Sequence, residues 1–400
     1  METRAWSKRW GSRPAQWQAL PPELLCRVFH YLPDVDRCNA RLSCREWDEV
    51  FRTPQLWRHR RFKFRGLDEA EGWRAARYLD SLGTHLRHLE LEIGMPVVQN
   101  ARIISLAVEK FLNTKPRGMR LQTFACSGLE FFQTPLYRIA RHRVRMVRAL
   151  CSTLRRHKWL ERVNLACCQM GREDGSRVLK ALTFHCRGPR PGSSKASSSC
   201  LSALELRDFF MEDVNVVELL PFLEEIGRFS ALRHVGLNYT YLSDAVLERL
   251  TQLTVALETL SLSLDGSHLL LITHMTHNNL TVSTAGWQAA AERCPQLRVL
   301  VDMRGRFRLM DFQRVLLPGM PLASLGIRTL IASLFFGSED MLAHIAGLLG
   351  YLGSHFCHTL GTQSRRSARA CVCVCVCVCV CVCVCVCVCV CVCVCVCVCV

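Results

Sequence analysis

The chain has 400 residues, half of them hydrophobic, and a formal net charge of +17. This length and apolar content exclude a chain too polar to bury a core, and they allow one large domain or a small module joined to a larger one. The basic excess, which arginine mainly carries, suits an acidic partner such as nucleic acid or an acidic protein, although a basic composition without a matching partner explains it equally well.

The first residues, METRAWSKRWGSRP, contain no apolar run, so a signal peptide is not expected. Eleven cysteines are scattered from Cys26 to Cys357, without a CxxC pair or the regular spacing of a disulfide framework. Scattered cysteines favour reduced thiols, so we expect the protein in the cytoplasm, the nucleus or both.

Residues 20–33, LPPELLCRVFHYLP, predict a short amphipathic helix. The apolar residues recur at helical spacing and share one side of this helix: Leu24, Leu25, Val28, Phe29 and Leu32. Pro22 suits the first helical position, where a missing N–H costs nothing. The apolar stripe could serve the chain's own core, a membrane or another protein.

The residues that follow predict two or three more short helices before residue 58. Asp34 and Asp36 suit a helix start, and Ser43 with Glu46 has the spacing of a capping box. A unit of about forty residues is too small to bury a self-sufficient core. It must therefore pack against the rest of the chain or keep an apolar face for a partner.

An ordered set of residues across this stretch resembles the F-box. The set is Leu20-Pro21, Glu23-Leu24-Leu25, Tyr31-Leu32, Asp36, Cys44-Arg45, Trp47 and Leu56-Trp57. The resemblance implies an adaptor that docks on Skp1 and joins, through Skp1, cullin-1 and a RING subunit in a ubiquitin ligase. It also implies a Skp1-binding surface made largely of Leu20, Pro21, Leu24, Leu25, Val28, Phe29 and Leu32.

For any one of these side chains the alternative is ordinary packing inside the module. Arg37 departs from the pattern of the family, in which many members have leucine at this position. We expect this departure to alter the affinity for Skp1 without abolishing docking.

A second pattern, of the form L-x-x-L-x-L, recurs from residue 84 onwards. It occurs as LRHLEL (86–91), LQTFAC (121–126), LERVNL (160–165), LSALEL (201–206), LRHVGL (232–237), LETLSL (257–262), LRVLVD (297–302) and LASLGI (322–327). Residues two apart in a strand point the same way, so each segment predicts a short strand with its leucines on one side. Helical stretches lie between the segments, at 101–112, 135–154, 243–253 and 287–294. This alternation resembles leucine-rich repeats, although a spacing of roughly 25 to 40 residues is irregular.

The predicted fold class is therefore α/β: an amino-terminal three-helix F-box module, then a curved leucine-rich-repeat solenoid of parallel strands with outer helices. The predicted organisation is a flexible terminus at 1–15, the F-box at 16–62, a connecting helical segment at 63–83, a substrate-binding repeat domain at 84–360 and a low-complexity tail at 361–400.

The tail alternates Cys and Val without a break from Cys371 to Val400. A GT dinucleotide repeat, read in triplets, encodes Cys-Val-Cys, so we interpret this tail as translated repeat DNA. Its length would also suit a membrane span, and its cysteines would suit soft metals. Its complete monotony argues against a shaped site of either kind.

The sequence contains none of the motifs that mark an enzyme: no GxGxxG after a strand, no P-loop, no GxSxG and no HExxH. His268, His274 and His277 cluster, but no cysteine or carboxylate joins them at ligand spacing, so we predict no metal site and no cofactor. Cys167 and Cys168, at the end of a predicted strand, are expected to fill core space. The absence of these motifs favours a non-catalytic protein, and the resemblance to the F-box implies that it is an adaptor.

Arg138, Arg141, Arg145 and Arg148 recur three or four residues apart and share one helix face. Such a stripe could lie along nucleic-acid phosphates, bind an acidic segment of a target, or be an ordinary solvated face. Two other function classes therefore stay open beside the ligase adaptor: a nucleic-acid-binding protein, and a repeat scaffold without a ligase role.

The residues between the leucines of each strand predict the surface that binds an unknown protein substrate, on the concave face of the sheet. The candidates are Glu90, Glu92, Asn164, Glu205, Arg207, Asn238, Ser261 and Arg328, with Tyr239 and Tyr241 as aromatic anchors. Holding a target near the charged E2 of a ligase would raise the effective concentration of the reacting groups. Nucleic acid and membrane are not expected partners.

Overall fold

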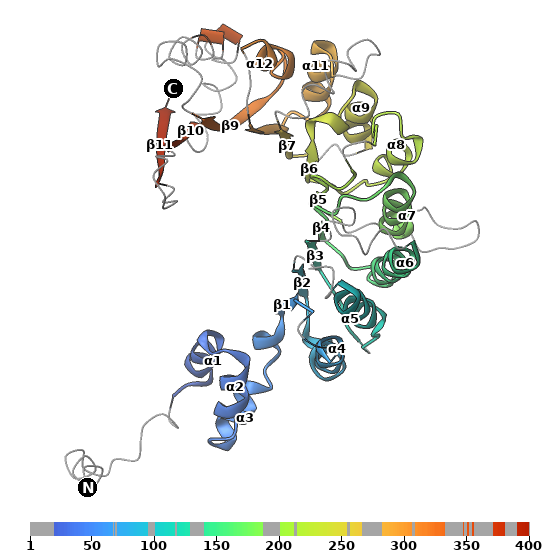
Figure 1. Ribbon diagram of the computed structural model, residues 1–400, viewed down its shortest axis with the longest axis vertical. Helices are drawn as coiled ribbons and strands as arrows, with labels where there is room; N and C mark the ends of the chain where they lie inside the picture. The colour runs from blue at the N-terminus through green and yellow to red at the C-terminus, as the bar shows by residue number, and fades with distance from the viewer. Residues whose placement is uncertain are drawn as a thin grey trace, which may run out of the picture.

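The computed structural model forms an arc, with a small helical module at one end and a parallel sheet lined by helices along the rest (Figure 1). The structure describes residues 20–66, 68, 70–94, 101–116, 118–128, 140–186, 201–211, 214–253, 257–265, 282–305, 309–332, 347, 350–351, 354–355, 371–380 and 390–399. The predicted fold class, a helical module followed by a solenoid of parallel strands with outer helices, is confirmed.

The amino-terminal module contains short helices: α1 (Pro22–Tyr31), α2 (Asp34–Ala40), α3 (Arg45–Phe51) and the 3-10 helix η2 (Pro54–Trp57). Pro22 lies in the first turn of α1, as predicted. The predicted capping box is wrong, because Cys44 is the N-cap residue of α3 and no side chain caps this helix. Ser43 instead closes the turn after α2, where its N–H donates to the carbonyl of Ala40.

Buried apolar side chains form the core of this module: Leu25, Phe29, Val50, Phe51, Leu56 and Trp57. The indole N–H of Trp57 donates to the carbonyl oxygen of Phe51 at 2.7 Å, and the two rings meet edge to face with centroids 4.9 Å apart. Tyr78, from the first helix of the solenoid, also packs against Trp57, with ring centroids 6.0 Å apart. The module therefore leans on the rest of the chain, as expected for a unit of its size.

The strands of the solenoid follow one another in chain order across the sheet. They are β1 (His59–Phe64), β2 (His88–Ile93), β3 (Thr123–Ser127), β4 (Arg162–Asn164), β5 (Ala203–Glu205), β6 (His234–Asn238), β7 (Thr259–Asp265), β8 (Arg298–Arg304) and β9 (Leu322–Ala332). Each L-x-x-L-x-L segment contributes a strand, as predicted. In β2, for example, Leu89 and Leu91 are buried while Glu90 and Glu92 lie on the other face.

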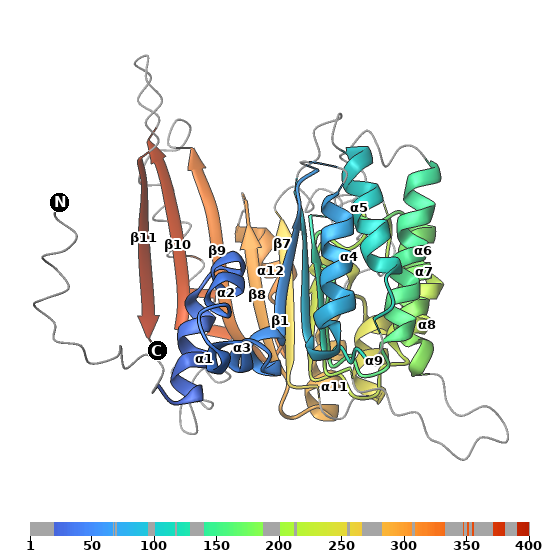
Figure 2. The same cartoon turned by 90° about the horizontal axis from the view of Figure 1, so that it is seen from below.

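The helices that return the chain between strands lie outside the arc, and the strands line its inside (Figures 1 and 2). They are α4 (Glu71–Leu82), α5 (Ala101–Asn113), α6 (Ala140–Arg156), α7 (Arg172–Leu182), α8 (Leu220–Ile226), α9 (Asp244–Leu253), α11 (Thr284–Arg293) and α12 (Leu309–Val315). Short 3-10 helices in the described part of the solenoid are η3 (Gly83–His85), η4 (Thr183–His185) and η5 (Tyr239–Tyr241). One continuous apolar core runs between the sheet and these helices, as stacked repeats require.

The sheet begins earlier than the predicted start at residue 84. Strand β1 pairs in parallel with β2 along its whole length, so the predicted connecting segment at 63–83 belongs to the first strand-helix unit. The sequence HRRFKF hides this strand because Arg61 and Lys63 separate its aromatic residues, and only Phe64 is fully buried. Only Arg58 lies between η2 and β1, so module and solenoid are joined directly.

The Cys-Val tail contributes β10 (Cys371–Val380), parallel to β9, and β11 (Val390–Cys399), antiparallel to β10. A perfect two-residue repeat can pair equally well after any shift of two residues, so this pairing has no specified register. The two strands therefore do not test the interpretation of the tail as translated repeat DNA, which stays a prediction.

Candidate interaction surfaces

The apolar stripe of α1 is divided between the module core and the surface. Leu25 and Phe29 are buried, and Phe29 meets Trp47 edge to face with ring centroids 5.6 Å apart. The other predicted Skp1-binding residues are exposed or half-buried: Leu20, Pro21, Leu24, Val28 and Leu32. Two of the predicted residues therefore hold the module together in this structure, while the others are accessible to a partner.

Three more exposed apolar side chains near this helix were missed in the sequence. Tyr31 is 87% exposed at the end of α1, and Val35 and Leu42 are 71% and 75% exposed on α2 and just beyond it. For Tyr31 the signal is spacing, because Leu24, Val28 and Tyr31 recur at four and three residues along α1. Leu24, Val28, Tyr31, Val35 and Leu42 are here named the amino-terminal apolar surface. Isolated exposed apolar residues are ordinary, whereas several close together in the sequence are typical of a surface that binds another protein.

Arg37 fixes α2 against the end of α1. Its Nε donates to the carbonyl oxygen of Phe29 at 2.6 Å, and a terminal N–H donates to that of His30 at 2.9 Å. The last carbonyls of a helix have no partner within the helix, and Arg37 supplies one. The side chain is only 12% exposed and pairs with Asp34 at 3.5 Å, so this departure from the F-box pattern is directed into the module.

The concave face of the sheet carries ion pairs between β1 and β2. Glu90 pairs with Arg61 at 2.6 Å, and Glu92 pairs with Lys63 at 3.0 Å. The parallel register causes both pairs, because it places Arg61 opposite Glu90 and Lys63 opposite Glu92. The hydrogen bond from Lys63 lowers the pKa of the Glu92 carboxyl. These predicted substrate-binding residues are accessible but already paired.

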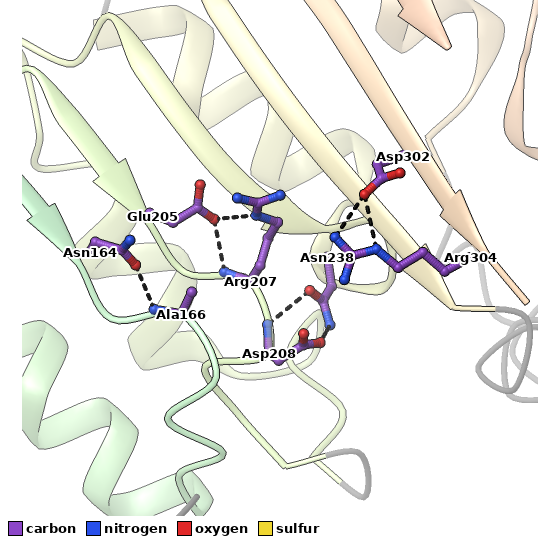
Figure 3. A network of polar contacts seen from close by, with 8 residues as sticks. All are labelled: Asn164, Ala166, Glu205, Arg207, Asp208, Asn238, Asp302 and Arg304. Carbon is purple, nitrogen blue, oxygen red and sulfur yellow. Dashed lines mark hydrogen bonds and ion pairs between the residues drawn. The ribbon is translucent and has the colours of Figure 1, made fainter. Parts of the chain in front are cut away.

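Glu205 and Arg207 form a second pair near the end of β5 (Figure 3). The Nε of Arg207 donates to Glu205 at 2.7 Å. Glu205 lies over Gly236 of the neighbouring strand, where an added Cβ would come within 2.2 Å of its carboxylate. Burial lowers the pKa of Arg207, but the hydrogen bond from Arg207 to Glu205 and the charges of Glu205, Asp302 and Asp208 outweigh burial and raise it.

The side chains of the two predicted asparagines accept hydrogen bonds from backbone N–H groups. Asn164 accepts the N–H of Ala166 at 2.9 Å. Asn238 is 5% exposed; its amide donates to the carboxylate of Asp208 at 2.7 Å and its oxygen accepts the backbone N–H of Asp208 at 2.9 Å (Figure 3). This two-point contact holds Asp208 in the left-handed region, at a φ of 51°. The surface position predicted for Asn238 is therefore wrong.

The predicted aromatic anchors are also wrong. Tyr239 and Tyr241 are 2% and 4% exposed, because the turn η5 directs both rings into the core. The hydroxyl of Tyr241 accepts the N–H of Phe210 at 2.9 Å and lies 3.2 Å from its carbonyl oxygen. Of the remaining candidates, Ser261 is half-buried on β7 and Arg328 belongs to β9, opposite Arg304 in the register.

The predicted basic helix is partly neutralised by its neighbours. Arg138 lies outside the described residues, and Arg141 lies within α6. Arg145 pairs with Glu109 of α5 at 3.0 Å, while Arg148 is exposed. These positions leave fewer unpaired charges on the helix than the sequence suggested.

The predicted metal-binding histidines, at 268, 274 and 277, lie outside the described residues. Within the described part of the chain, no group of three or more His, Cys, Asp or Glu is arranged to hold a metal ion. Cys168 is buried, as expected of a core residue, whereas Cys167 is exposed. Among the residues that the structure describes, no helix combines the length and apolar character needed to cross a membrane.

The helical module matches a known family at residues 17–63, under the description F-box-like. These residues form an F-box-like domain. The chain is 48% identical to F-box/LRR-repeat protein 21 of Bos taurus over 48 residues, which are 12% of this chain and 11% of that protein. It is 46% identical to F-box/LRR-repeat protein 5 of Danio rerio over 41 residues, which are 10% of this chain and 6% of the relative. The chain therefore spans about a ninth or less of the length of these curated relatives.

Proposed function

We propose that this protein is a non-catalytic substrate adaptor of a Skp1-cullin-F-box ubiquitin ligase. The observation that carries the proposal is the division of α1 within an F-box-like domain: Leu25 is buried in the core, while its neighbour Leu24 is 44% exposed. An apolar stripe that is only half used by its own core offers the remaining side chains to another protein. Skp1 would bind there, and through it cullin-1 and a RING subunit would join.

The direct joining of module and solenoid suits the positioning of a target. Arg60 forms an ion pair with Asp34 of the module and lies 4.8 Å from the ring of Tyr78 on α4. Burial raises the pKa of Tyr78 to about 12, in agreement with a ring closed inside this junction. A junction of this kind would hold a target on the concave face in a fixed relation to the ligase, which raises the effective concentration of the reacting groups.

Within the F-box proteins that carry irregular repeats, four segments suggest a finer likeness. LCRVF (25–29), Asp36-Arg37, LWRHR (56–60) and LNYTYLSDAVLERL (237–250) resemble F-box only protein thirty-nine. We propose this protein as a relative. The likeness adds no substrate, so the identity of the target rests on experiment.

The proposal is tested by recovering partners from cells that express the full chain. We expect the unmodified chain to retain Skp1 and cullin-1, and the Leu24→Asp/Val28→Asp variant to lose both. Leu220→Asp is the matched control, because Leu220 is 68% exposed on α8. Leu25 is unsuitable because it is buried. Failure of the unmodified chain to retain Skp1 would remove the ligase role.

The same cells identify targets when ligase activity is blocked. A target held by the solenoid should be retained by the unmodified chain and by the Leu24→Asp/Val28→Asp variant alike, whereas ligase subunits should be retained only by the former. Proteins retained by both the unmodified chain and the Leu24→Asp/Val28→Asp variant are substrate candidates. Binding of RNA or DNA that weakens steeply with salt would instead favour the nucleic-acid-binding class.

A further inference from the structure

A row of residues crosses the amino-terminal edge of the concave face, one residue from each of the strands β1 to β8. The parallel registers place its members opposite one another in the order His59, His88, Thr123, Arg162, Ala203, His234, Thr259 and Arg298. This row contains no carboxylate. It is here named the amino-edge row.

The amino-edge row alternates basic and small residues. Strands β2, β4, β6 and β8 contribute His88, Arg162, His234 and Arg298, whereas β3, β5 and β7 contribute Thr123, Ala203 and Thr259. Arg162, His234 and Arg298 are exposed, and the small residues between them are half-buried. The exposed side chains are therefore separated from one another by smaller, less exposed residues.

The cationic groups of the row have few partners on the protein. Arg162 and Arg298 take part in no ion pair among those in the described part of the chain. Two carboxylates on residues adjoining the row have partners of their own: Glu161 accepts from Gln122 at 3.2 Å, and Glu258 pairs with Arg233 at 3.0 Å. Two arginine charges on this edge are thus available to a ligand.

The first two imidazoles of the row are already held in place. The rings of His59 and His88 stack with centroids 3.9 Å apart and planes inclined by 7°. Nδ1 of His88 lies 2.9 Å from Oγ1 of Thr123. Burial lowers the pKa of His88, and His59, Arg162 and Arg58 lower it further, while the charge of Glu161 acts in the opposite direction.

Strand spacing sets the size of a matching ligand. Strands lie roughly 4.8 Å apart, so basic residues on alternate strands are separated by roughly 10 Å. This is about three residues of a peptide in the polyproline II conformation, in which every third side chain points the same way. A nucleic-acid backbone would spread beyond a single row. The residues two positions further along the strands include Glu90 and Glu205, roughly 7 Å away, which pair with Arg61 and Arg207, so these positions offer no cation to a second line of phosphates.

The geometry points to the amino-edge row as a docking track for an acidic peptide segment of the target in the polyproline II conformation, with carboxylates about three residues apart. Arg162 and Arg298, four strands apart, would pair with two of the carboxylates, and His234, midway between them, would donate a hydrogen bond to a third. The inference rests on the proposed adaptor function and names the chemistry of its target.

The test measures binding of fluorescent nine-residue peptides to the full chain by anisotropy at two salt concentrations. One peptide has Glu at every third position, a second has the same Glu residues adjacent, and a third has Gln in place of Glu. We expect the evenly spaced Glu peptide to bind best. Arg162→Glu/Arg298→Glu should weaken its binding at least tenfold, and Arg162→Gln/Arg298→Gln should weaken it less.

The matched control is Arg102→Glu/Arg148→Glu, which changes the net charge equally at exposed positions on α5 and α6. It should bind the evenly spaced peptide as the unmodified chain does. The inference would be overturned if the chain bound the Glu and Gln peptides equally well. It would also be overturned if Arg162→Glu/Arg298→Glu and Arg102→Glu/Arg148→Glu weakened peptide binding equally, or if single-stranded DNA of the same charge bound more tightly than the peptide. Skp1 binding by the unmodified chain is measured in parallel. If the chain binds the peptide but not Skp1, the adaptor function is rejected and the peptide-docking track still stands.

Discussion

Nε of Arg37, on α2, donates a hydrogen bond to the carbonyl oxygen of Phe29, on α1, at 2.6 Å. The amino-terminal apolar surface lies on both of these helices, so this bond helps to set how its two parts are arranged. The Arg37 guanidinium also lies 5.7 Å from the ring of Trp57, which closes the module core. One side chain therefore contacts both of the helices that carry the amino-terminal apolar surface and the core of the module.

Replacement of Arg37 by leucine should destabilise the F-box-like domain. The carbonyl groups of Phe29 and His30 would lose their charged donor, at a cost of roughly 1–3 kcal/mol in the free energy of unfolding. Denaturant unfolding followed by tryptophan fluorescence measures this change. Arg45→Leu is the control, since the Arg45 side chain is 90% exposed and should contribute little. Equal stability of both variants would contradict the role given to Arg37.

Adjacent leucines on α1 should respond differently to truncation. Leu25→Ala creates a cavity in the module core and should lower the free energy of unfolding by roughly 2–4 kcal/mol. Leu24→Ala removes an exposed side chain and should change it by no more than about 0.5 kcal/mol. Denaturant titration of both variants gives the comparison. Similar losses at both positions would show that the stripe is not divided as described.

The strands of the solenoid could be predicted from the sequence because burial in a strand recurs every two residues. Leucines and other apolar residues follow that period in the segments from Leu86 to Ile327. Strand β1 was not predicted because Arg61 and Lys63, which face the concave surface, leave only Phe62 and Phe64 as apolar residues in this strand. Charge on one face and aromatics on the other is still a strand pattern. Only pairing with β2 makes it visible.

The division of the α1 stripe could not be predicted from spacing alone. Leu24 and Leu25 have the same chemistry, and what separates them is the position of α3 and η2, which bury one and leave the other. Similarly, Tyr239 and Tyr241 follow a strand and looked accessible, but η5 turns them inward. The amino-edge row depends on the register of eight strands, which no single segment encodes.

Loss of the Tyr241 hydroxyl should affect stability and leave target binding intact. In Tyr241→Phe the buried N–H of Phe210 loses its acceptor, which should lower the free energy of unfolding of the solenoid by about 1–2 kcal/mol. Tyr31→Phe is the control, because Tyr31 is 87% exposed. Calorimetric unfolding should separate the two. A Tyr241→Phe chain as stable as the unmodified one would contradict the assigned hydrogen bond.

Acid should destabilise the solenoid through His157. Its side chain is 5% exposed, and burial, with Arg156 beside it, lowers its pKa from 6.5 to about 4. Between these values the unfolded chain binds the proton and the folded chain does not, so stability falls as the pH drops from about 6.5 towards 4. The full difference is worth roughly 3 kcal/mol.

His157→Gln should remove this contribution, because glutamine does not titrate. Denaturant unfolding at a series of pH values compares the slopes of the two chains. The variant should lose less stability than the unmodified chain on acidification. Parallel curves below pH 6.5 would show that His157 titrates alike in the folded and unfolded chains.

Titration of purified Skp1 into the full chain by calorimetry tests the adaptor role most directly. The unmodified chain should bind with one-to-one stoichiometry, and Leu24→Asp/Val28→Asp should weaken binding at least a hundredfold without changing the unfolding temperature. The control, Leu106→Asp/Leu220→Asp, alters leucines that are 40% and 68% exposed outside the F-box-like domain and should bind as tightly as the unmodified chain. No binding by the unmodified chain, or equal affinity in the Leu24→Asp/Val28→Asp variant, would contradict the claim that this surface is where Skp1 docks.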